Sequence, residues 1–199
     1  MTCGLNLGLE LEALRRVYRT RDLKDVVHVE DAVSLGVAVL PVLPDGAMRD
    51  VLRRVLREKG WEEGADGTLA KSFEDAVATL SADGREITLR VRASADVAVS
   101  GRAQVKEPGS EAQAEASAEA AARRAMEKRT EEERARLSEE NLRRLAREEP
   151  ALRREVQESL NRTYREALEL RARQLGEVET MQERGDAAGS YEVTVVVKA

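Results

Sequence analysis

The sequence predicts an α+β fold: a mainly antiparallel sheet with short helices, and a long helical insertion before a C-terminal β-hairpin. Three observations favour this class. Short apolar stretches in the first half alternate with polar residues, as half-buried strands do. Residues 111–149 consist almost entirely of helix-forming residues. The chain ends in SYEVTVVVKA, whose valines are typical of a strand, and a strand must pair its backbone groups with a neighbour.

The N-terminal half is expected to supply the sheet and its short helices. Leucine recurs at every second position from Leu5 to Leu11, which predicts a strand with one buried face. The segment EALRRVYRT after it predicts a short helix, and SLGVAVLPVLP predicts a strand that ends at its prolines. GAMRDVLRRVLREKG carries an apolar stripe at helical spacing, so we expect a helix that ends at Gly60, with Trp61 packed under the sheet.

The clearest hairpin lies in DAVATLSADGREITLRV, where alternating apolar residues flank the pair Asp83-Gly84. Asp-Gly is a favoured two-residue turn between antiparallel strands. The following segment ADVAVSGRAQV predicts a further strand, in which Gly101 marks a break or a bulge.

The long insertion is predicted to contain two or three helices. A fresh start is expected near Thr130, within the very polar stretch EKRTEEERAR, and Pro150 suits the first turn of another helix. Gly176 ends the insertion, and EVETMQER and YEVTVVVK are expected to pair as a hairpin. We therefore predict an α+β sheet domain at 1–107, a helical insertion at 108–175, and a C-terminal hairpin at 176–199 that completes the sheet.

The composition excludes several classes of function. The formal net charge is −5 with both signs interleaved, so the chain lacks the basic field that drives nucleic-acid binding. No apolar run approaches the roughly 20 residues that span a bilayer, and the N-terminus lacks the pattern of a signal peptide, so we expect a cytoplasmic protein. A single cysteine, Cys3, excludes an internal disulfide and a cysteine-based metal cluster.

The one candidate for acid–base chemistry is His28, the only histidine, which has Glu30 and Asp31 close by in the sequence. Catalysis normally requires a nucleophile, an oriented base and an oxyanion donor together, and no such companions are evident. A structural or surface histidine is the favoured interpretation, and no cofactor or metal site is expected.

Residues 160–198 resemble a small family encoded in cyanobacteria and algal plastids. Relatives of that family are accessory domains of bacterial ternary systems built around an FtsH-like AAA+ ATPase and a von Willebrand A domain. The positions that carry the resemblance are Leu160, Asn161, Tyr164, Ala172, Gly176, Val178, Gly189 and Val193 to Val197. The resemblance implies an accessory or adaptor role beside an ATPase, and it brings no catalytic residues with it.

Three functional hypotheses follow. The first is a non-catalytic protein-interaction module, an adaptor whose partner is an AAA+ ATPase or a second copy. The second is a structural protein that assembles through its helical segment, and the third is a small enzyme that uses His28. The first hypothesis places the contact surface on an apolar stripe of the insertion, formed by Leu137, Leu142, Leu145, Leu152, Val156, Leu160 and Tyr164.

Overall fold

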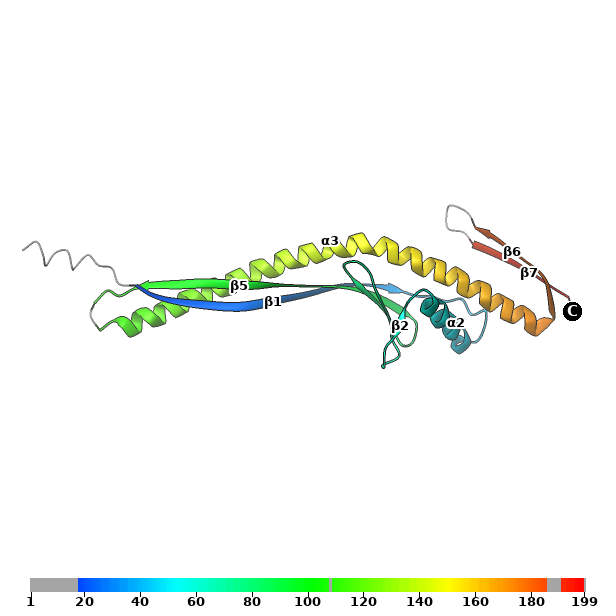
Figure 1. Cartoon of the computed structure of the whole chain (residues 1–199), viewed down its shortest axis with the longest axis horizontal. Helices are drawn as coiled ribbons and strands as arrows, with labels where there is room; N and C mark the ends of the chain where they lie inside the picture. Colours follow the sequence, from blue (N-terminus) through cyan, green and yellow to red (C-terminus); the bar gives the residue numbers. More distant parts are fainter. Residues whose placement is uncertain (1–17, 108, 186–190, 199) are drawn as a thin grey trace, which may run out of the picture. The chain divides into compact units, whose positions relative to one another are not determined.

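The computed structural model describes residues 18–107, 109–185 and 191–198 (Figure 1). Its elements are β1 (Tyr18–Gly36), α2 (Asp45–Glu58), β2 (Glu62–Glu63), β3 (Leu69–Ser72), β4 (Val77–Leu80), β5 (Glu86–Gln104), α3 (Glu111–Leu175), β6 (Glu177–Gly185) and β7 (Tyr191–Lys198). The strands form a five-stranded sheet in the order β1-β5-β4-β3-β2 and a two-stranded sheet of β6 and β7. The α+β class is therefore confirmed, with its antiparallel sheet, long helix and C-terminal hairpin.

Contacts group the chain into two compact units, each made of two segments. The first contains Met1–Val29 and Ala93–Glu140, and the second contains Glu30–Arg92 and Asn141–Ala199. We call them the first and the second unit and describe each by itself. The predicted domain boundaries after residues 107 and 175 stay predictions.

The second unit has its core on one face of the sheet. Every second residue of β5, from Ile87 to Val91, is buried, together with Ala78 and Leu80 of β4. The apolar stripe of α2 supplies Leu52 and Leu56 to this core, as its spacing predicts. Trp61 is buried in the same cluster, directly after Gly60, whose φ of 86° ends the helix in the left-handed conformation that glycine tolerates.

The predicted hairpin around Asp83-Gly84 is confirmed, but its connection is longer than a two-residue turn, because the backbone N–H of Ser81 donates to the carbonyl of Glu86. β4 pairs with β5 in an antiparallel register that sets Leu80 opposite Ile87. The Ser81 hydroxyl donates to an Asp83 carboxylate oxygen at 2.6 Å, and this bond lowers the pKa of Asp83 below its usual value. Hydrogen bonds between residues of the turn therefore stabilise it, and Ser, Asp and Gly are the residues that predict such a turn from the sequence.

The first unit contains parts of two strands and the beginning of α3. Val27 of β1, Val97 of β5 and Leu137 of α3 form its buried cluster. The alanines Ala114, Ala118 and Ala122 are also buried, at helical spacing, along one face of α3. A Cβ placed on Gly101 would lie 2.2 Å from the carbonyl oxygen of Ala118. Gly101 is thus a point of close helix–strand approach inside β5, and the break predicted there is wrong, since the strand continues to Gln104.

Three predicted elements differ from the structure in their limits. Residues 18–20 belong to β1 and not to a helix, and β1 ends at Gly36, before the prolines. The strand predicted from residue 95 continues without interruption from the hairpin strand as β5. The predicted strand at Leu5–Leu11 and the thiol of Cys3 lie outside the described residues.

The insertion is one helix of 65 residues, so the predicted division into two or three helices is wrong. Around Thr130 the polar stretch is held by ion pairs one turn apart, such as Lys128–Glu132 and Arg136–Glu133. Pro150 lies inside the helix, and both it and Ala146 are exposed. Proline has no N–H to donate to the carbonyl of Ala146, and at this exposed stretch of the helix water can replace the missing donor.

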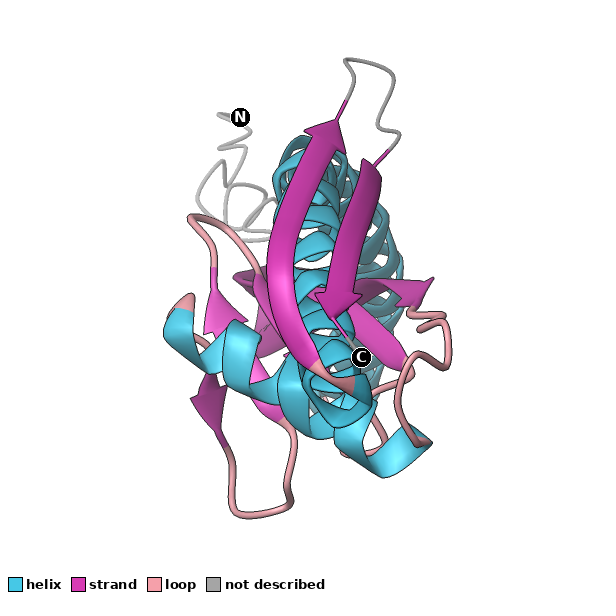
Figure 2. Ribbon diagram, turned by 90° about the vertical axis from the view of Figure 1, so that its right-hand side faces the viewer, coloured by secondary structure: helices cyan, strands magenta, loops and turns pink. Residues whose placement is uncertain are grey.

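The C-terminal hairpin is present, but it does not complete the large sheet. β7 pairs with β6 alone, in a register that sets Glu177 opposite Lys198, and the two strands lie side by side in Figure 2. A partner nearby in the chain closes only a short loop at a small cost in entropy. The edges of the five-stranded sheet are β1 and the two-residue β2, and neither is paired with the hairpin. Gly176 is required before β6, since a Cβ there would lie 2.3 Å from the carbonyl oxygen of Lys198.

Candidate interaction surface

The apolar stripe that the sequence offers as a contact surface is mostly covered by the protein itself. Leu137 is buried in the first unit. In the second unit, Leu145 and Leu152 belong to the sheet core, and Val156 and Leu160 pack against it. Leu142 is the exception, with 57% of its surface exposed. Whether these residues bind a partner stays a prediction, but the structure gives most of them an internal role.

Tyr164, the last residue of the stripe, anchors α3 to the segment that precedes α2. Its hydroxyl accepts a hydrogen bond from the backbone N–H of Leu40 at 3.1 Å and donates to the carbonyl of Ala38 at 3.4 Å. Its ring packs against the cluster of Leu43, Met48 and Ala167. The tyrosine therefore serves the packing of the second unit on both its polar and its apolar side.

His28 lies exposed on β1 in the first unit. Its neighbours by alternation along the strand are Val26, which is 47% exposed, and Glu30, which pairs with arginines of β5. In the described ranges, no group of three His, Cys, Asp or Glu side chains is placed to hold a metal ion.

A half-buried polar cluster joins α3 to β3 and to the end of α2. Glu155 of α3 accepts a bond from the indole N–H of Trp61 at 2.7 Å, and it accepts bonds from Lys71 Nζ at 2.8 Å to each carboxylate oxygen. Lys71 also donates to the carbonyl of Lys59 at 2.9 Å. Beside them, Lys59 pairs with Glu158 and lowers the pKa of that carboxyl through its hydrogen bond and its charge. The cluster fixes how α3 lies on the sheet, and its donors and acceptors are matched to one another.

Replacing Glu155 by alanine is expected to reduce the free energy of unfolding by about 1–3 kcal/mol, because the Trp61 indole N–H would lose its acceptor and the Lys71 ammonium group its carboxylate partner. Urea denaturation followed by Trp61 fluorescence measures the change. Glu149→Ala is the matched control, since Glu149 on the same helix only pairs with Arg153 one turn away. Equal effects of the two substitutions would contradict a special role of the cluster.

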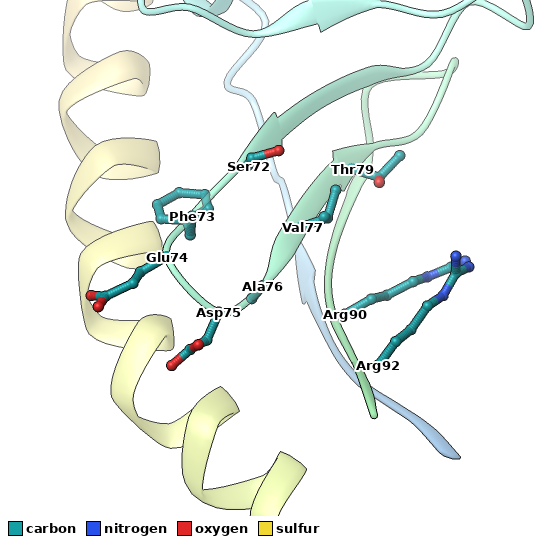
Figure 3. Close-up of a pocket in the computed structure, with 9 residues that line it drawn as sticks. All are labelled: Ser72, Phe73, Glu74, Asp75, Ala76, Val77, Thr79, Arg90 and Arg92. Carbon is teal, nitrogen blue, oxygen red and sulfur yellow. The ribbon is translucent and has the colours of Figure 1, made fainter. Parts of the chain in front are cut away.

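The opposite face of the sheet in the second unit carries a hollow of about 490 Å³ (Figure 3). Val77, 45% exposed, and Thr79 of β4 lie on this face, and residues 72–76 border the hollow. Arg90 and Arg92 of β5 point outward beside each other, while Glu74 and Asp75 point toward α3. An exposed apolar side chain lies here beside two guanidinium groups.

A single carboxylate organises the two arginines. Glu30 of β1 contacts Arg92 at 2.5 Å and Arg90 at 3.6 Å. On the other side of the hollow, Asp75 pairs with Arg147 of α3 at 3.2 Å. Glu30 thereby holds both guanidinium groups on one side of the hollow, and the arginine side chains remain 49% and 76% exposed for a further acceptor. Such a surface can receive an acidic residue next to an apolar one.

The sequence reasoning missed these arginines, although they leave a signal. In LRVRAS the two arginines flank the buried Val91 at alternate positions of a strand, which places both on the face opposite the core.

Within the described part of the chain, no helix is long and apolar enough to cross a membrane. A comparison with curated proteins and one with solved structures gave no match. A comparison with protein families did give one: the model of the FtsH ternary system domain X5 matches residues 14–199, which include every strand and helix described above. The resemblance of residues 160–198 therefore extends over nearly the whole sequence, and the chain belongs to the FtsH ternary system domain X5 family.

Proposed function

We propose that this chain is a non-catalytic adaptor that binds the FtsH-like AAA+ ATPase of its system through the hollow on the open sheet face. Membership of the family supports an accessory role in an FtsH-associated system. The observation that carries the docking site is the pair Arg90 and Arg92, exposed beside Val77 and held by Glu30. Arginine is enriched among the residues that contribute most of the binding energy in protein interfaces, and here two arginines lie beside an exposed apolar side chain.

The partner segment that fits this surface is acidic and carries an apolar side chain. The apolar side chain would lie on Val77 and Thr79, and a carboxylate would bind the guanidinium groups of Arg90 and Arg92 in a forked geometry. Complementary charge raises the rate of encounter and fixes the orientation of the partner.

The exposed face of α3 is the alternative docking surface. It would be used if the protein assembled through its helical segment. Its charges are largely used within the helix: Arg123 pairs with Glu119, Arg153 with Glu149, and Arg173 with Glu169. Pairs of this kind are typical of a solvated helix face, which favours the sheet hollow as the docking site.

The double substitution Arg90→Glu and Arg92→Glu is expected to raise the dissociation constant of the complex with the ATPase by about tenfold or more. The reversed charges would repel an acidic segment and would also lie against Glu30. Binding is measured by isothermal calorimetry or fluorescence anisotropy with the purified ATPase, at two salt concentrations. The effect should shrink as salt screens the charges.

The matched control is the double substitution Arg153→Glu and Arg173→Glu, which changes the net charge equally on exposed positions of α3. It should leave binding within about twofold of the unmodified protein. If instead this pair abolished binding and the Arg90 and Arg92 variant did not, the docking site would lie on the helix.

A further inference from the structure

We infer that β7 is a dimerisation strand: it pairs antiparallel with β7 of a second copy about Val195, so that two hairpins form one four-stranded sheet. In the described residues, β7 pairs on one side only, with β6. A two-stranded hairpin is marginally stable alone, whereas sheets of three or more strands with an apolar face are stable. The unpaired side of β7 exposes a row of backbone donors and acceptors that fits another strand.

The charges of β7 fit a second copy of the same strand. β7 has one anionic and one cationic side chain that the structure describes, Glu192 and Lys198, and they lie at equal distances in sequence on either side of Val195. In a two-fold antiparallel pair about Val195, Glu192 of each copy therefore lies opposite Lys198 of the other. A two-fold pair about Thr194 or Val196 sets neither of these charges opposite its counterpart.

The same register extends the charge pattern of the hairpin itself. Within one chain, Arg184 lies opposite Glu192, and Glu177 lies opposite Lys198. At each end of the four-stranded sheet, four charged side chains would lie side by side across the strands. In order they are Arg184 of β6, Glu192 of β7, and then Lys198 and Glu177 of the second copy. The sign alternates at every step, and opposite charges on neighbouring strands stabilise a sheet.

The apolar residues fit equally well. Val193, Val195 and Val197 are half-buried on one face of β7, and Val195 lies opposite Met181 of β6. In the proposed pair, Val195 meets Val195 of the second copy, and Val193 meets Val197. The valines of both copies thereby form one continuous apolar face, and β-branched pairs across strands are favourable.

The outer edge of β6 is unsuited to such pairing. The β6–β7 ladder is irregular between Val178 and Thr180, which leaves Glu179 out of the register. Bulges and charged side chains are the features that protect sheet edges from other strands. The hairpin thus has one protected edge and one open edge, and the open edge is the valine-rich one.

The first test is a disulfide between copies, with Cys3→Ser introduced so that no other thiol is present. Residues directly opposite in an antiparallel pair have Cα atoms about 4.5–5.5 Å apart, within the range of a disulfide. Val195→Cys in the full-length chain should therefore give a covalent dimer under mild oxidation. Met181→Cys is the control, since in the four-stranded sheet the two copies of this position lie three strand spacings apart, about 14 Å, too far to be bridged. Equal cross-linking of both variants, or of Met181→Cys alone, would overturn the proposal.

The second test needs no new thiol. Glu192→Lys sets like charges opposite each other at both ends of the β7 pair, so self-association in analytical ultracentrifugation should weaken about tenfold. Arg184→Glu disturbs the same pair inside the hairpin but does not face the second copy, so it should leave association unchanged. Inverting all four signs, with Glu177→Lys, Arg184→Glu, Glu192→Lys and Lys198→Glu together, should restore association. A monomer at every concentration of the unmodified chain, or no difference between Glu192→Lys and Arg184→Glu, would overturn the proposal.

Discussion

Replacing Leu152 by alanine is expected to lower the free energy of unfolding by about 2–5 kcal/mol. Leu152 has no exposed surface and lies in the core cluster of the second unit with Trp61, Leu69 and Leu89. Truncation removes its apolar contacts and leaves a cavity, because α3 is fixed beside it by the Glu155 cluster and cannot collapse inward freely. Urea denaturation, monitored by Trp61 fluorescence and by circular dichroism, measures the loss.

Leu142→Ala on the same helix is the matched control. Leu142 was chosen from the same sequence stripe, but it is 57% exposed, so its truncation should change the free energy of unfolding by no more than about 0.5 kcal/mol. An equal loss of stability in both variants would contradict the packing described here, in which Leu152 faces the sheet and Leu142 faces solvent. If Leu142→Ala weakened binding of the ATPase without loss of stability, the predicted contact surface on the stripe would regain support.

These two leucines show what an apolar stripe can and cannot reveal. The sequence indicates that one face of the helix is to be covered, because apolar residues recur at helical spacing. A helix face that packs on the protein's own sheet and one that packs on another chain show the same apolar spacing. The spacing therefore does not reveal which of the two covers the helix. In the structure the protein's own sheet covers Leu145 and Leu152.

The elements that were predicted well depend on local signals. The stripe of α2, the end of that helix at Gly60, and the turn at Asp83-Gly84 each follow from residues adjacent in sequence. Local propensity and local geometry agree at these places, which is the condition under which sequence reasoning succeeds.

The elements that were predicted poorly depend on contacts far apart in sequence. Gly101 lies inside a continuous strand because a helix approaches it closely, and no pattern near Gly101 contains that helix. Thr130 and Pro150 are ordinary start signals, but both lie within α3, where ion pairs and exposure to solvent offset their cost. Arg90 and Arg92 could not be assigned to a binding surface from the sequence, because that requires knowing which face of β5 is left uncovered by the rest of the protein.

The second large effect is expected at Gly101. Gly101→Ala should cost about 3 kcal/mol or more, at the upper end of what overpacking a core costs. The added methyl group would lie 2.2 Å from the carbonyl oxygen of Ala118 and 2.5 Å from the backbone nitrogen of Ala122. Backbone atoms of a helix cannot turn aside as a side chain can, so α3 must move away from β5. The cluster of Val27, Val97 and Leu137 would then lose contact.

Gly36→Ala is the control that separates this close approach from the general effect of replacing a strand glycine. Gly36 also lies in a strand, its φ is not positive, and a Cβ there would meet no atom within 4 Å. At such a position alanine restricts the unfolded chain and should leave stability unchanged or raise it by about 0.4–1 kcal/mol. The two substitutions are chemically identical, so any difference between them reflects the surroundings of each glycine. The melting temperature should fall for Gly101→Ala, and it should stay the same or rise slightly for Gly36→Ala. A melting temperature of Gly101→Ala equal to that of Gly36→Ala would show that α3 does not press on β5 in the first unit, and the alanine face of α3 would then need another partner.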